Sequence, residues 1–152
     1  MTLFFRKPFK YSFFNATLGI IVINTIFFIL TTTFPKLEYI FGLNPVLFWY
    51  NKMYWQPLTY MFTHSSIMHI VFNMLGLVFF GIVLEKTLGS KEFILLYMIC
   101  GVLCGLISLA VYTFFGLNVL LVGASGAIYA LLLTYAVIFP RSKIYIWGIL
   151  PV

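Results

Sequence analysis

The sequence predicts an all-α polytopic membrane protein with four complete spans and the start of a fifth. Three observations lead to this class. Of the 152 residues, 63% are hydrophobic and only 8% are charged, whereas soluble domains are about half apolar and about a quarter charged. The apolar residues form long runs, and basic residues flank these runs. Too few charges remain to cover a water-facing surface, which excludes an ordinary soluble enzyme, a disordered tail and a disulfide-rich secreted domain.

The first run, residues 13–34, has the roughly 20 apolar residues that a helix needs to cross the hydrocarbon core. Pro35 and Lys36 end it. Residues 36–57 are rich in aromatic side chains, which is typical of the membrane–water interface. We expect a long loop here, with short helices that lie on the bilayer. The side chains interpreted as interface anchors, in preference to a substrate gate, are Trp49, Tyr50, Tyr54 and Trp55.

Three further spans are predicted at residues 67–84, 93–115 and 119–139. The last of them is interrupted by Gly-Ala-Ser-Gly at 123–126. A fifth span begins at Ile144 and stops at Val152, and about nine residues cannot cross a bilayer as a helix. We therefore expect residues 1–152 to form one membrane domain that is incomplete at its C-terminus.

Basic residues set the predicted orientation. Of nine Lys and Arg, most lie in three clusters that an alternating path places on one side of the membrane. By the positive-inside rule this side, with the N-terminus, is cytoplasmic. The clusters do not form a groove, so we expect no nucleic-acid partner. The compact chain and its short basic leader suggest a bacterial inner (plasma) membrane protein. The three clusters are Arg6, Lys7 and Lys10; Lys86 and Lys91; and Arg141 and Lys143.

Several residues have structural interpretations. Cys100 and Cys104 lie four residues apart in one apolar run, and we interpret them as packing residues because no other metal ligand is near in sequence. Gly101 and Gly105 are interpreted as sites of close helix packing. Glu85 is expected to cap or pair at a helix end.

Polar side chains inside a bilayer are costly and need a reason. His69 and Ser125 each lie 16 residues before the cytoplasmic end of their span, which places both about 24 Å above that edge. Asn73 lies one turn deeper than His69 on the same helix face. The two glycines beside Ser125 resemble a nucleophile elbow, and a helix that starts there directs free N–H groups at an oxyanion. Helix packing by small residues and an interhelical hydrogen bond are the structural alternatives.

Two separated motifs carry a family resemblance. His64, His69 and Asn73 form the pattern HxxxxHxxxN, and Gly123-Ala124-Ser125-Gly126 follows with Tyr129 four residues after the serine. Gly81 and the segment 85–90 fit between them. The chain from Trp55 to Val152 resembles the rhomboid intramembrane serine proteases, and the resemblance implies a rhomboid-like helical bundle.

The resemblance implies a role for each matching residue. Ser125 is the nucleophile that attacks a peptide carbonyl and forms an acyl-enzyme. His69 and Asn73 stabilise the oxyanion together with the backbone N–H of Ser125, and His64 supports the nearby hydrogen-bond network. The residues that shape the site are Gly123, Gly126 and Tyr129.

The resemblance also implies the reaction's setting. The substrates are single-span membrane proteins, cut near the outer face where a helix end unwinds. Water reaches the serine through a polar cavity that opens to the outside. Neither a metal nor an organic cofactor is expected.

The sequence departs from the family in its general base, which is a histidine on the sixth membrane helix. This chain has two histidines, and both match the other motif. A swap of His69 into the role of base conflicts with its place on the oxyanion side. We therefore expect a truncated chain that lacks the base and is inactive by itself. Gln56 and Thr87 also stand where the family favours arginine, so the loop hydrogen bonds should differ.

Three functions compete. The first is an intramembrane serine endopeptidase with a Ser–His dyad. The second is a catalytically inactive rhomboid-like protein that binds membrane helices, and the third is a small transporter or channel component. The intact Ser125 and His69 motifs favour the first. The sequence leaves the oligomeric state open.

Overall fold

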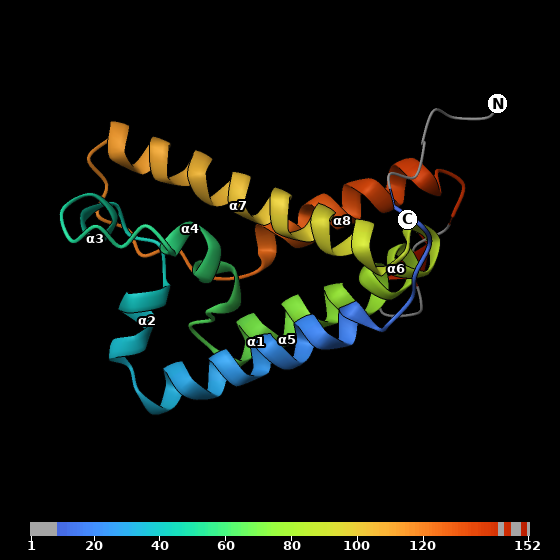
Figure 1. Ribbon diagram of the computed structural model, residues 1–152, viewed down its shortest axis with the longest axis horizontal. Helices are drawn as coiled ribbons and strands as arrows, with labels where there is room; N and C mark the ends of the chain where they lie inside the picture. Colours follow the sequence, from blue (N-terminus) through green and yellow to red (C-terminus); the bar gives the residue numbers. More distant parts are fainter. Residues whose placement is uncertain (1–8, 143–144, 147–149, 152) are drawn as a thin grey trace.

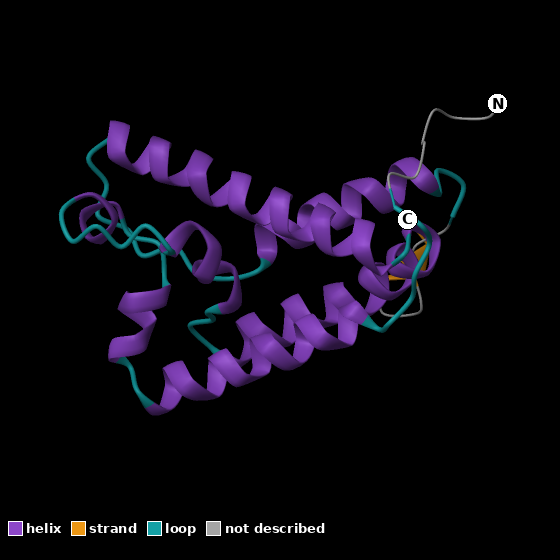
Figure 2. Ribbon diagram, viewed as in Figure 1, coloured by secondary structure: helices purple, strands orange, loops and turns teal. Residues whose placement is uncertain are grey.

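A computed structural model describes residues 9–142, 145–146 and 150–151. These residues form a bundle of helices (Figures 1 and 2). Three helices in this part of the chain are long and apolar enough to cross a membrane: Ala16–Thr33, Ile67–Leu88 and Ser90–Phe114. The predicted class, a helical polytopic membrane protein, is confirmed.

Helix α1 (Ala16–Thr33) is the first span, predicted at 13–34. Two of its buried polar side chains, Asn24 and Thr31, do not interrupt it, because they bond back to the preceding turn. Asn24 Nδ2 donates to the carbonyl of Ile20 (2.8 Å), and Thr31 Oγ1 donates to the carbonyl of Phe27 (3.0 Å). Such bonds satisfy side-chain donors within the helix and let them face apolar surroundings.

The predicted loop does contain short helices. They are α2 (Lys36–Phe41), α3 (Pro45–Trp49) and α4 (Gln56–Thr59), followed by the 3₁₀ turn η1 (Tyr60–Phe62). Asn44 Oδ1 accepts a hydrogen bond from the N–H of Leu47 (3.1 Å) and so caps α3, while Pro45 fills the first helical position. In Figure 1 these elements lie together at one end of the bundle.

The second span is longer than the predicted 67–84. It consists of α5 (Ile67–Gly76), the π-helical turn η2 (Leu77–Gly81) and α6 (Ile82–Leu88). Ser66 caps its start, since Ser66 Oγ accepts from the N–H of His69 (3.2 Å). The helix continues to Gly89, whose φ of +96° ends it.

The third span, α7 (Ser90–Phe114), begins three residues earlier than predicted and packs along α8 (Ser125–Ile138). The fourth differs more, because only residues 125–138 of the predicted 119–139 are helical. Gly123, with φ +111°, is incompatible with a continuous helix. With 14 residues, α8 is about 21 Å long, which is shorter than the hydrocarbon core.

Small residues bring the helices together. A methyl group on Gly76 would lie 2.7 Å from Ile128 Cγ2, and one on Gly105 would lie 2.5 Å from Tyr60 Cε1. A methyl group on Gly101 would lie even closer to the side chain of Met61. Close packing at Gly101 and Gly105, predicted from their spacing, is confirmed.

Glu85 joins the first three spans. Its carboxylate accepts hydrogen bonds from the N–H groups of Ala16 (2.6 Å) and Thr17 (2.9 Å), from Thr17 Oγ1 (2.7 Å) and from Ser90 Oγ (2.5 Å). The predicted capping role is confirmed, and the capped helix is α1. We call these four residues the Glu85 junction.

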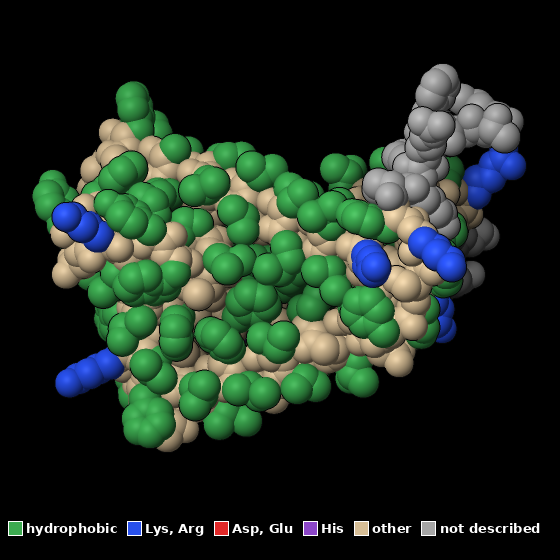
Figure 3. Space-filling model, in the orientation of Figure 1, with side chains coloured by type: hydrophobic (Ala, Val, Ile, Leu, Met, Phe, Trp, Pro, Cys, Tyr) green, Lys and Arg blue, Asp and Glu red, His purple; other side chains and the backbone are tan. Residues whose placement is uncertain are grey.

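The remaining surface is mostly apolar. In the view of Figure 3, hydrophobic side chains cover the middle of the molecule and Lys and Arg lie at its two ends. Most of the partial fifth span predicted at 144–152 lies outside the described residues. Its described residues form a short antiparallel pair, β1 (Tyr145–Ile146) and β2 (Leu150–Pro151), instead of a helix. Ile and Tyr favour extended backbone, which fits β1.

Candidate active site

Ser125 is the first residue of α8 and is exposed at the surface of the described chain. The helix has no side-chain cap at this end. The first N–H groups of a helix have no intrahelical acceptor, and they carry a partial positive charge. The hydroxyl of Ser125 therefore lies beside donors that favour a negative charge on a nearby oxygen.

Gly123 connects the serine motif with the histidine motif. A methyl group on Gly123 would lie 2.5 Å from His69 Nε2 and 2.7 Å from Cε1. The imidazole of His69 therefore occupies the space that a side chain at residue 123 would need. Only glycine permits both this approach and the φ of +111°. The two motifs, far apart in sequence, meet two residues before Ser125.

His64 and His69 face each other. Their ring centroids are 5.0 Å apart in an edge-to-face arrangement, and Ser65 Oγ lies 3.3 Å from His69 Nδ1. Burial and, to a smaller extent, His69 lower the pKa of His64 from 6.5 to about 4, against the opposing effect of the Phe62 backbone. His64 is therefore neutral at pH 7, and neither of its buried ring nitrogens has a hydrogen-bond partner among the described residues.

Asn73 is buried one turn below His69. Its Nδ2 donates to the carbonyl oxygen of His69 (2.7 Å), so the amide is anchored to its own helix. This bond uses one of the two N–H groups of the amide. The structure thus places Asn73 beside His69.

Gly126 and Tyr129 occupy different surroundings. Gly126 packs against α7, where a methyl group would lie 2.8 Å from Cys104 Cβ. This contact fits the predicted packing role of Cys104. The side chain of Tyr129 is 71% exposed, and within the described residues it makes no ring contact with either histidine.

The extended segment that leads to Ser125, residues 118–124, is held by the loop before the second span. Leu43 and Leu121 form an antiparallel bridge, with N–H to O distances of 2.9 and 2.8 Å. The N–H of Gly123 donates to the carbonyl of Tyr60 (2.9 Å). We call residues 118–124 the nucleophile segment.

Asn44 and Tyr60 form hydrogen bonds that the sequence did not predict. Asn44 Nδ2 donates to Asn118 Oδ1 (2.7 Å) and to the carbonyl of Val119 (3.3 Å). Tyr60 donates its hydroxyl to the carbonyl of Gly101 (2.7 Å), and burial raises its pKa to about 12. The sequence around either residue does not indicate these bonds, because the bonded residues lie more than 40 positions apart.

Gln56 and Thr87, which stand where the rhomboid family favours arginine, form hydrogen bonds with backbone groups. Gln56 is fully buried, and its Oε1 accepts from the N–H of Asn44 (3.2 Å) while Nε2 donates to the carbonyl of Tyr39 (3.0 Å). Thr87 Oγ1 donates to the carbonyl of Val83 (2.8 Å). Gln56 thus organises the loop without a charge.

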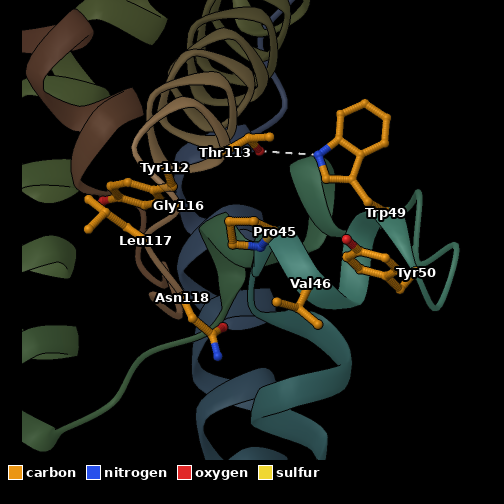
Figure 4. Close-up of a pocket in the computed structure, with 9 residues that line it drawn as sticks. All are labelled: Pro45, Val46, Trp49, Tyr50, Tyr112, Thr113, Gly116, Leu117 and Asn118. Atoms are coloured by element: carbon orange, nitrogen blue, oxygen red, sulfur yellow. Dashed lines mark hydrogen bonds between the residues drawn. The ribbon is translucent and has the colours of Figure 1, made fainter.

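A cavity of about 440 Å³ lies beside the start of the nucleophile segment, between α3 and the end of α7 (Figure 4). The indole N–H of Trp49 donates to Thr113 Oγ1 (3.1 Å) across its rim. Its lining is mainly apolar and aromatic, and comprises Pro45, Val46, Trp49, Tyr50, Tyr112, Thr113, Gly116, Leu117 and Asn118.

Comparison with known proteins agrees with the motifs. A family model for the rhomboid domain matches residues 51–152. RHOMBOID-like protein 1 of Arabidopsis thaliana is 40% identical over 78 residues, which are 51% of this chain and 19% of that protein. The putative rhomboid protease YdcA of Bacillus subtilis is 32% identical over 85 residues, 56% of this chain and 41% of YdcA. Rhomboid protease GlpG of Salmonella newport is 37% identical over 79 residues, 51% of this chain and 26% of GlpG. The chain thus spans less than half the length of these relatives.

Proposed function

The chain belongs to the rhomboid family, and on that premise we propose that it is part of an intramembrane serine endopeptidase with Ser125 as its nucleophile. The observation that carries this proposal is the contact between Gly123 and the His69 imidazole at the start of α8. This contact supports a site that combines a serine, a helix N-terminus and an imidazole donor. These are the parts that acyl transfer requires.

In the proposed reaction, Ser125 Oγ bonds to the carbonyl carbon of the scissile peptide, and its proton passes to a general base. The carbonyl oxygen becomes an oxyanion. When the C–N bond breaks, the base returns the proton to the leaving amine and an acyl-enzyme remains. Water then attacks the ester and gives a proton to the base; as the ester C–O bond breaks, the base returns this proton to Ser125 Oγ and the acid is released.

Stabilisation of the oxyanion is assigned to the Ser125 N–H, His69 and Asn73. The first N–H groups of α8 are fixed by the helix, so they need no reorganisation during the reaction. His69 supports this role by its position against Gly123. Asn73 supports this role with the N–H group that its bond to the His69 carbonyl leaves unused. His64, whose ring packs against His69, is assigned to the support of the neighbouring network.

The general base is assigned to a histidine other than the two in this sequence. His64 is buried and His69 lies on the oxyanion side. A serine without a base is a poor nucleophile. We therefore expect the 152-residue chain alone to be inactive, and the exposed ring of Tyr129 is the surface against which we place the missing histidine.

The proposed substrates are single-span membrane proteins, cut near the outer face of the membrane. The exposed position of Ser125 at a helix end supports access by an extended peptide and by water. We place the N-terminus in the cytoplasm of a bacterial cell, because Lys86, Lys91 and Arg141 lie at the ends of spans that this orientation turns inward.

Fluorophosphonate labelling of the native-length protein in lipid vesicles tests the proposal. Labelling and cleavage of a single-span substrate should both disappear in Ser125→Ala. Both should persist in Ser142→Ala, a matched control at an exposed serine beyond the far end of α8. Labelling or cleavage that survives in Ser125→Ala would overturn the assignment. A native-length protein that binds membrane helices but neither labels nor cleaves would instead be the inactive rhomboid-like binder.

A further inference from the structure

The start of the nucleophile segment has little apolar anchorage, whereas Leu121 and Ala124 further along pack in the core. Leu117, Asn118 and Val119 are exposed, and Val119 retains 40% of its accessible surface. Apart from the bridge between Leu43 and Leu121, the segment contains no regular secondary structure. The course of the chain as it leaves α7 must therefore be set largely by the hydrogen bonds that it makes to other parts of the chain.

Those bonds fall at alternate residues. The carbonyl of Val119 accepts from Asn44 Nδ2. The N–H and carbonyl of Leu121 both bond to the backbone of Leu43, and the N–H of Gly123 donates to the Tyr60 carbonyl. Alternate residues of an extended chain present their backbone groups to the same edge. One edge of the nucleophile segment is thus attached throughout to the loop at residues 43–60.

Among these three attachments, only the one made by Asn44 uses a side chain. Its Nδ2 serves both Asn118 Oδ1 and the Val119 carbonyl, while its Oδ1 caps α3 and its N–H donates to Gln56 Oε1. The residue is only 7% exposed, so these bonds have little competition from water. Gly42 adds to the tight fit, because a methyl group there would lie 2.9 Å from Leu120 Cδ1.

We propose that Asn44 is a positioning residue for Ser125. It acts through the nucleophile segment, which it holds at its far end so that Gly123 lies against His69 and α8 starts at Ser125. Its effect on proteolysis rests on the proposed function, whereas its hold on the segment does not. The two parts are therefore measured separately.

Asn44→Ser is the informative variant. Serine is as good an N-cap as asparagine, so α3 keeps its cap, but the donor to Asn118 and Val119 is lost. Asn51→Ser is the matched control, since Asn51 lies exposed in the same loop. Asn118→Ala removes the partner of the 2.7 Å bond, and its effect should not add to that of Asn44→Ser, because both delete the same interaction.

The first readout is amide hydrogen exchange of the native-length protein. In Asn44→Ser the amides of Leu121 and Gly123 should exchange on the order of tenfold faster. Amides within α7 should keep their rates, and Asn51→Ser should change none of these. Unchanged exchange at Leu121 and Gly123, or equal acceleration throughout α7, would overturn the positioning role.

The second readout is the kinetics of cleavage. Because a shifted nucleophile loses attack geometry and leaves substrate binding intact, kcat should fall on the order of tenfold with KM nearly constant. A rise in KM alone, with kcat unchanged, would assign Asn44 to substrate binding and contradict the proposal. If the protein cleaves no substrate at all, the exchange result still decides whether Asn44 holds the segment, and only the proposed function fails.

Discussion

The two ends of the bundle are held together by different chemistry. At the Glu85 junction one buried carboxylate accepts four hydrogen bonds from α1 and from the start of α7. At the other end the nucleophile segment is held by neutral bonds from Leu43, Asn44 and Tyr60. Hydrogen bonds to an ionised group are roughly twice as strong as neutral ones. The spans are thus joined firmly away from the candidate site, and the site itself depends on several weaker bonds.

The largest effect is expected at the Glu85 junction. Glu85→Ala leaves the N–H groups of Ala16 and Thr17 buried without an acceptor, and should lower the free energy of unfolding by about 3 kcal/mol. Equilibrium unfolding in mixed micelles measures this loss. Glu38→Ala is the control, because no side-chain hydrogen bond of Glu38 occurs among the described residues, and it should cost less than about 0.5 kcal/mol. Equal losses in the two variants would remove the contrast between the ends.

A smaller loss is expected at Gly123. Gly123→Ala forces an L side chain to adopt φ +111° and places its methyl group against His69. It should destabilise the chain by about 2 kcal/mol. Gly19→Ala is the matched control, since no atom lies within 4 Å of a methyl group there and alanine favours a helix. Thermal unfolding of both variants makes the comparison, and an unchanged Gly123→Ala would show that the His69 contact is absent.

The smallest effect concerns pH. His64 has a folded-state pKa of about 4 and an unfolded value near 6.5. Between these values the unfolded chain binds the proton more tightly, so stability is full above about pH 6.5 and falls as the pH drops towards 4. The loss due to His64 should be about 1 kcal/mol at about pH 5.5, and His64→Gln should remove that part of the pH dependence. An imidazole titration of His64 with a midpoint near 6.5 would contradict the burial of this ring.

Local composition explains how far the sequence predicts the fold. Long apolar runs placed the first span at 13–34, and the helix is Ala16–Thr33, because membrane helices must satisfy their own backbone and therefore follow hydropathy. The same rule failed at 119–124. That stretch is apolar, yet its backbone bonds to Leu43 and Tyr60 instead of within a helix.

The candidate site likewise contains residues that the sequence predicts and residues that it does not. His69, Gly123 and Ser125 were predicted by motif and depth, and the structure brings His69 and Gly123 together. Asn44 and Tyr60 were not predicted, because pairing between segments more than 60 residues apart leaves no periodicity in either one. The roles of Ser125, His69 and Asn73 in a reaction stay predictions until the labelling experiment is done.

The π-helical turn Leu77–Gly81 changes the direction in which side chains point before and after it in the second span. A wider turn adds one residue, and each residue of an α-helix advances the side chains by about 100°. Gly76, before the turn, faces Ile128 of α8, while Gly81, at its end, faces Thr17 and Phe93. One continuous helix thereby packs against two sets of neighbours. When relatives are aligned with this chain, a single-residue gap within 77–81 marks a change of helical phase, and side chains on either side of it should be compared as two separate helices.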